Sequence, residues 1–187
     1  EPQKRQSAAF GAITERKVWM KNAVLLGFPG GNGYPKGFRG FTSANVMDAV
    51  TVEKANPEKP FNSRKKAVKE FNGVINYEKL RVAAGSLVIP EVRAEVDMEN
   101  RKIFFTHEKE EIESVDCFLD DKLYAVLLCK TKYICRVEEL GLRGETIEKS
   151  VNFSEKIAGG GLVIYVFAKN ADGKDVSDSV CLWEAES

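Results

Sequence analysis

The spacing of apolar side chains changes near Tyr77 from a helical period to the alternation typical of strands. Residues 3–26 contain no proline and place apolar side chains three to five positions apart, which predicts a helix. Two further helices are expected over residues 43–55 and 64–76, each preceded by residues that can cap a helix. We therefore predict a helical N-terminal region at residues 1–76.

The rest of the chain, residues 77–187, predicts an antiparallel β-sandwich, because short apolar runs alternate with turn residues. The expected strands cover residues 86–97, 102–107, 122–130, 133–140, 149–153, 161–170 and 177–184. Residues 123–129 and 162–168 are apolar at almost every position, so both faces of these two strands need a cover. The N-terminal helices are the available second layer, which predicts an α+β protein with helices packed on the sandwich.

The distribution of charge along the chain also favours docking of the N-terminal region on the sandwich. The chain has 28 basic and 28 acidic residues, so its net charge points to neither a nucleic acid nor a membrane. Residues 1–75 contain 13 basic and 6 acidic residues, and residues 76–187 contain 15 and 22, which gives +7 and −7. Opposite charges favour contact between the two parts. No apolar run approaches the roughly 20 residues of a membrane-spanning helix, so no membrane span is predicted.

The four cysteines do not form a metal-binding or redox motif, because no two of them have the CxxC spacing. Cys117, Cys129, Cys135 and Cys181 each lie in an apolar stretch, which favours buried free thiols. A hairpin disulfide between Cys129 and Cys135 is the alternative. We predict no metal site.

No motif predicts catalysis or a cofactor. The glycine-rich loop at residues 27–40 follows a helix and lacks both dinucleotide-binding and Walker spacing. His107 lies beside several glutamates and could act as a general base of a hydrolase, but its alternation with Ile103 and Phe105 favours a buried structural role. The acidic run at residues 108–116 lacks the spacing of a calcium loop. The sequence shows no convergent polar constellation, so we predict a protein that is not an enzyme, with no catalytic or cofactor-binding residues.

Two groups of residues are candidates for binding a partner. Aromatic and basic side chains on the glycine-rich loop could form an adhesive surface, consisting of Tyr34, Phe38, Arg39 and Phe41. A basic patch could bind nucleic acid through Arg64, Lys65, Lys66 and Lys69, together with Lys4, Arg5, Arg16 and Lys17. Docking between the two parts is the favoured role of these charges, because their lysines lack the interleaved aromatics of base-stacking surfaces.

Residues 165–184 resemble the last two strands of a fibronectin type III or related immunoglobulin-like domain, with Ala168, Asn170 and Gly173 matching its turn. In that comparison His107 takes the place of the usual inward tryptophan of the second strand. The whole chain, through residues 61–87 and its C-terminus, resembles a bacterial family of unknown function with a helical N-terminal part and an immunoglobulin-like C-terminal domain. Members of such a family are expected to begin some tens of residues earlier. The family brings no known active site or ligand.

Together these patterns predict a structural or protein–protein interaction module for adhesion or assembly. Its expected location is the bacterial exterior or a phage-like particle rather than the cytoplasm, and its expected partner is another protein or a surface assembly. The alternative is a nucleic-acid-binding protein that uses the basic N-terminal helices.

Overall fold

The computed structural model describes residues 1–31, 33–55 and 70–186. The helices in these residues are α1 Pro2–Thr14, α2 Lys21–Gly27, α3 Phe38–Asn45 and α4 Glu155–Ala158. The strands are β1 Val50–Lys54, β2 Phe71–Ile75, β3 Arg93–Asp97, β4 Lys102–His107, β5 Lys122–Cys129, β6 Ile134–Leu142, β7 Ile147–Asn152, β8 Leu162–Lys169 and β9 Val180–Glu184. The expected α+β class is confirmed, and every pair of neighbouring strands in the sheets is antiparallel.

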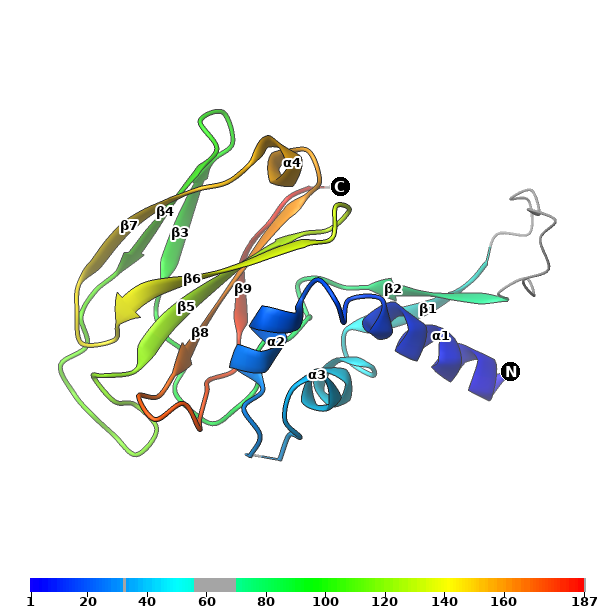
Figure 1. Ribbon diagram of the computed structural model, residues 1–187, viewed down its shortest axis with the longest axis horizontal. Coiled ribbons are helices and arrows are strands. Elements are labelled where there is room, and N and C mark those ends of the chain that lie inside the picture. The colour runs from blue at the N-terminus through cyan, green and yellow to red at the C-terminus, as the bar shows by residue number, and fades with distance from the viewer. Residues whose placement is uncertain (32, 56–69, 187) are drawn as a thin grey trace.

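Two sheets of the C-terminal part face each other (Figure 1). One contains three strands in the order β3-β4-β7, and the other contains four in the order β6-β5-β8-β9. Their inner faces share an apolar core, because alternate residues of β5 and β8 point into it. The central side chains of this core are Ile103, Phe105, Leu123, Leu127, Ile164 and Val166, all fully buried.

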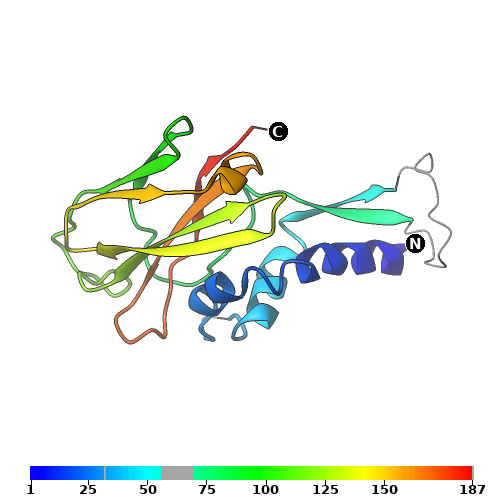
Figure 2. The same cartoon turned by 45° about the horizontal axis from the view of Figure 1, so that its top comes forward.

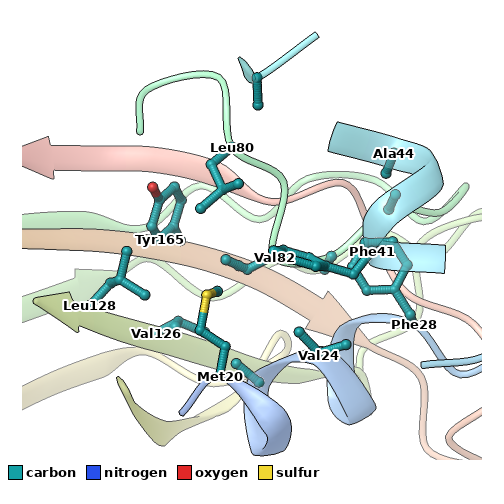
Figure 3. Packing of buried hydrophobic residues seen from close by; sticks show 14 of the residues in the cluster. Met20, Val24, Phe28, Phe41, Ala44, Leu80, Val82, Val126, Leu128 and Tyr165 are labelled. Carbon is teal, nitrogen blue, oxygen red and sulfur yellow. The ribbon is translucent and has the colours of Figure 1, made fainter. Parts of the chain in front are cut away.

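The outer face of the four-stranded sheet is equally apolar and is covered by the N-terminal part (Figure 3). Tyr165 and Phe167 on β8 point to this side and have no exposed surface. They pack with residues from β5, from α2 and α3 with their flanking residues, and from the segment after Tyr77. These residues include Met20, Val24, Phe28, Phe41, Leu80, Val82, Val126 and Leu128. The expected cover over the second face is therefore present.

The segment after Tyr77 can lie against α2 because Gly27 has no side chain. A Cβ atom at Gly27 would lie 1.9 Å from the carbonyl oxygen of Val82, closer than any real contact. Asn45 of α3 fixes the same segment, since its side-chain oxygen accepts a hydrogen bond from the Arg81 backbone N–H at 2.7 Å.

All three predicted N-terminal helices are wrong in part. Residues 50–54, expected to end a helix, form β1, and residues 71–75, expected within another, form β2. Val50 and Val52 alternate with polar residues and can serve a strand as well as a helix, but the pairing partner, Phe71–Ile75, is distant in the chain and was not evident from local spacing. The predicted helix at residues 3–26 is interrupted at residues 15–20, between α1 and α2.

Helix α1 packs on the β1–β2 hairpin, and together they project from the sandwich (Figures 1 and 2). Phe71 and Ile75 are buried beneath the helix, and the Arg5 guanidinium lies 4.7 Å from the centroid of the Phe71 ring. The described helices include none that is long and apolar enough to cross a membrane.

Candidate functional site

A buried arginine brings together the loops at one end of the sandwich. Arg143, with no exposed surface, donates from Nε to Asp121 Oδ2 at 3.0 Å and from Nη1 to Glu110 Oε1 at 3.0 Å. Its Nη2 donates to the Val88 carbonyl oxygen at 2.6 Å. One guanidinium thus connects three segments that are distant in sequence. We call Arg143, Asp121, Glu110, His107 and Cys117 the Arg143 cluster. The expectation that no polar side chains converge is wrong at this place.

His107 is held by backbone carbonyls on both sides of its ring. Nδ1 lies 2.9 Å from the Glu91 carbonyl oxygen and Nε2 lies 2.9 Å from that of Arg143. Only a doubly protonated ring can donate to both, whereas a neutral ring donates to one. The ring is 3% exposed and borders a cavity of about 430 Å³ that Glu108 and Glu110 also line. A general base needs a free nitrogen directed at its substrate, and both nitrogens here are already in contact with the protein.

Cys117 completes the cluster and is a poor nucleophile. Its thiol donates a hydrogen bond to Glu110 Oε2 at 3.0 Å. Burial, and then this hydrogen bond, raise the pKa of Cys117 to about 11, so the thiol stays protonated at neutral pH. Burial alone would raise the pKa of Glu110, but the hydrogen bonds from Cys117 and Arg143 outweigh burial and hold it below its usual value.

Asp121 occupies the most enclosed position of the cluster. Burial raises the pKa of its carboxyl, against the lowering effect of the Phe118 backbone N–H and of Arg143. Its Oδ2 accepts from both of these donors, at 3.1 and 3.0 Å, while its Oδ1 is buried without a hydrogen-bond partner. The cluster therefore holds the loops at this end of the sandwich in place, at the energetic cost of burying the Asp121 carboxyl with one oxygen unpaired.

The cluster supports an exposed loop that carries both acidic and apolar side chains. We call residues 108–121 the acidic loop: it contains seven acidic residues and one lysine. Ile112 is 82% exposed and lies between two glutamates, and Val115 is 87% exposed and lies beside Asp116. Ser114 and Cys117 exchange backbone hydrogen bonds at 2.9 and 3.4 Å, and the Val88 N–H donates to the Asp116 carbonyl at 2.7 Å. The two apolar side chains are thus presented on a hydrogen-bonded loop.

The four residues proposed as an adhesive surface do not share one exposed face. Phe41 is fully buried against Phe28, with ring centroids 6.0 Å apart. Tyr34 and Phe38 are half-buried in the same aromatic group, and only Arg39 is exposed. Phe41 therefore belongs to the core under α3 and cannot form part of an exposed surface.

The residues proposed as a basic patch, Arg64, Lys65, Lys66 and Lys69, lie outside the described residues. The additional basic residues of the N-terminal part are engaged with the protein. Lys4 pairs with Glu70 at 2.6 Å, and Arg5 lies over Phe71. Arg16 donates to the Tyr77 hydroxyl at 2.9 Å, and the Lys17 ammonium lies 5.5 Å from the Phe38 ring centroid.

All four cysteines are free thiols. Cys129 pairs with Ile134 across β5 and β6, so Cys135, the next residue, points to the opposite face of the sheet. Cys129 lies in the core between the sheets, while Cys135 contacts the helical cover. This alternation excludes the hairpin disulfide. Among the described residues, no group of histidine, cysteine and carboxylate side chains could hold a metal ion.

Sequence reasoning identified His107 and the acidic run but missed Arg143 and Asp121. Arg143 stands in a turn, Leu142 to Gly144, and Asp121 follows another aspartate, so both patterns predict solvent-exposed turn residues. No local signal distinguishes a buried arginine from an exposed one.

No family model, curated protein or solved structure matches this chain.

Proposed function

We propose that this protein is a non-enzymatic protein–protein interaction module for adhesion or assembly, and that the acidic loop is its contact surface. The observation that carries the proposal is the exposure of Ile112 and Val115, at 82% and 87%, on a loop held by hydrogen bonds. Exposed apolar side chains on an ordered loop contribute to binding at little entropic cost, because the loop is already close to its bound conformation.

The proposal includes an immunoglobulin-like sandwich as the scaffold. In such domains strands A, B and E belong to one sheet and strands C, F and G to the other, with an added C′ strand beside C in the variable type. The strand orders β3-β4-β7 and β6-β5-β8-β9 agree with A-B-E and C′-C-F-G. The acidic loop then lies between strands B and C, where sandwiches of this type often carry binding loops.

The absence of catalysis is part of the proposal and is supported by the Arg143 cluster. Both nitrogens of His107 contact carbonyl oxygens, and the Cys117 thiol has its pKa raised to about 11. The resemblance to a bacterial family with an immunoglobulin-like domain supports a location at the cell exterior or in a phage-like particle. Nucleic-acid binding by the basic N-terminal residues is less favoured, because Lys4, Arg5 and Arg16 are engaged within the chain.

Site-specific photo-crosslinking tests the proposal. A photoreactive amino acid is placed at Ile112 in the full chain, and the variant is produced in the cells that naturally make the protein. The matched control carries the same amino acid at Met47, which is 81% exposed and follows α3, outside the acidic loop. We expect one discrete protein adduct from position 112 that is absent from position 47. No adduct from position 112, or the same adducts from both positions, contradicts the proposal.

A further inference from the structure

A second exposed apolar surface lies where the α1–α2 turn meets the β5–β6 turn. Trp19 and Tyr133 contact each other edge to face, with ring centroids 5.8 Å apart. Tyr133 is 62% exposed, and Val18, the neighbour of Trp19 in the sequence, is 85% exposed. We call residues 16–21 and 130–133 the basic patch of the turns. It shares only Arg16 and Lys17 with the basic residues considered above for nucleic-acid binding.

The charge of this patch is opposite to that of the acidic loop. Its two segments contain five basic residues and no acidic one, namely Arg16, Lys17, Lys21, Lys130 and Lys132. Lys130 pairs with Glu184 at 2.6 Å, while Lys21 and Lys132 are exposed. The patch therefore presents apolar side chains within a basic border, and the acidic loop presents them within an acidic border.

The two surfaces cannot meet within one molecule. Strand β5 begins directly after the acidic loop and ends at the β5–β6 turn, and it has eight residues. At about 3.3 Å per residue the strand separates the two surfaces by about 26 Å. Figure 1 places the two ends of β5 at different ends of the sandwich. The acidic loop and the basic patch of the turns can therefore contact each other only between two copies of the chain.

We propose that the acidic loop of one copy docks on the basic patch of the turns of the next, which makes the chain a head-to-tail self-assembling module. The inference rests on the proposed function and names its partner. The contact joins two different surfaces, so it is heterologous and continues into a chain or closes into a ring. A nucleic acid or an anionic membrane would fit the basic patch of the turns but would leave the acidic loop without a partner, whereas a second copy engages both.

The experiment measures the mass of the purified full chain by sedimentation velocity over a range of protein concentrations. At an ionic strength of about 0.01 M, where charges act over about 30 Å, we expect the average mass to rise with concentration. At about 1 M the range falls to about 3 Å, and we expect at least a tenfold weaker association.

Charge reversal identifies the surfaces. The loop variant carries Glu108→Lys, Glu111→Lys, Asp116→Lys and Asp120→Lys, and the patch variant carries Lys17→Glu, Lys21→Glu and Lys132→Glu, all at exposed positions. These changes take the formal charge of the loop from −6 to +2 and that of the patch from +5 to −1. We expect each variant alone to stay monomeric, since its own two surfaces now repel. A mixture of the two should associate, because each reversed surface then meets one of opposite charge. The control is Glu148→Lys on the exposed side of β7, which should associate like the unmodified chain. Circular dichroism checks that every variant is folded.

Several results overturn the inference: a monomeric unmodified chain at all concentrations, association that persists in both variants, or a mixture that remains monomeric. Binding of anionic vesicles or an oligonucleotide by a chain that stays monomeric also overturns it. If the chain is monomeric while the photoreactive group at Ile112 still gives its specific adduct in cells, only self-docking fails. If the adduct is missing too, the proposed function fails with it.

Discussion

Two regions hold the C-terminal strands together by different physics. Around β5 and β8, many apolar side chains cover both faces of one sheet, and the stabilisation is shared among them. At the loop end, a single guanidinium connects Asp121, Glu110 and the Val88 carbonyl. Apolar burial therefore distributes stability over many contacts. A buried charge concentrates stability in one residue, because its removal leaves the partner groups without a hydrogen bond or counter-charge.

The largest effect is expected when a charge enters the apolar region. Val166→Asp should prevent folding, because it places an unpaired carboxylate in the core between the sheets, where Val166 has no exposed surface. Circular dichroism and urea denaturation measure the loss. Phe104→Asp is the matched control, since Phe104 is 43% exposed on β4 and should tolerate the change. A Val166→Asp variant with near-normal melting would contradict the alternation assigned to β8.

The next largest loss of stability is expected when the guanidinium of Arg143 is removed. Arg143→Met should reduce the free energy of unfolding by about 3–5 kcal/mol, because Asp121 is left buried without its cation. The matched control is Arg136→Met on β6, whose side chain is 41% exposed and whose ion pair should contribute less than about 1 kcal/mol. Urea denaturation gives both values. Adding Asp121→Asn to Arg143→Met should recover part of the loss, and no recovery would mean that the buried carboxylate is not its cause.

A third prediction compares the two covers of the four-stranded sheet. Leu127 and Leu128 are neighbours on β5, both fully buried, and point to opposite faces, one toward the facing sheet and one toward the helices. Changing either to alanine should cost about 2–5 kcal/mol, since each leaves a cavity. Equal costs, with single transitions that agree between tryptophan fluorescence and circular dichroism, indicate one cooperative body. A much smaller cost for Leu128→Ala would show that the helical cover contributes little.

The smallest effect is a pH dependence at Glu110. Because folding holds the pKa of Glu110 below its usual value, its contribution is present above the unfolded pKa of about 4.3 and is lost as the pH falls toward the folded value. Glu110→Gln should therefore be less stable than the unmodified chain at pH 7, by up to about 1 kcal/mol because the carboxyl is partly exposed. The difference should shrink at about pH 3. Urea denaturation at both pH values measures it, with Glu148→Gln as control; a difference that grows on acidification contradicts the direction.

Local patterns predicted all seven C-terminal strands, because residues that alternate between two buried faces carry a period of two, although the strand expected at residues 86–97 forms only at Arg93–Asp97. Val163, Tyr165 and Phe167 face one side of β8 and Ile164 and Val166 the other, as the apolar run required. The N-terminal strands were missed because their apolar spacing fits either a helix or a strand, and pairing with a distant segment decided between them.

The candidate site was only partly predictable. The acidic composition of residues 108–121 was evident, but the exposure of Ile112 and Val115 depends on how the loop is held by Ser114, Cys117 and Val88. Tyr34, Phe38 and Phe41 were expected on a surface because aromatic residues in a glycine-rich loop can serve either a surface or a core. Tyr34 and Phe41 pack against Phe28, and Phe38 packs against Phe41. This aromatic group forms because the segment folds onto the sheet, which the local spacing does not encode.

Side-chain type and periodicity were enough to predict the C-terminal strands, the need of β5 and β8 for a cover on both faces, and the separation of the chain's charges into two parts. These properties follow from side-chain type and periodicity along a short stretch of backbone. The burial of Arg143, the pairing of β1 with β2, and the contact of Trp19 with Tyr133 were decided only by the folding of the whole chain. Each of these joins residues far apart in the chain, and burial or contact between distant residues is settled by packing and desolvation of the whole rather than by local preference.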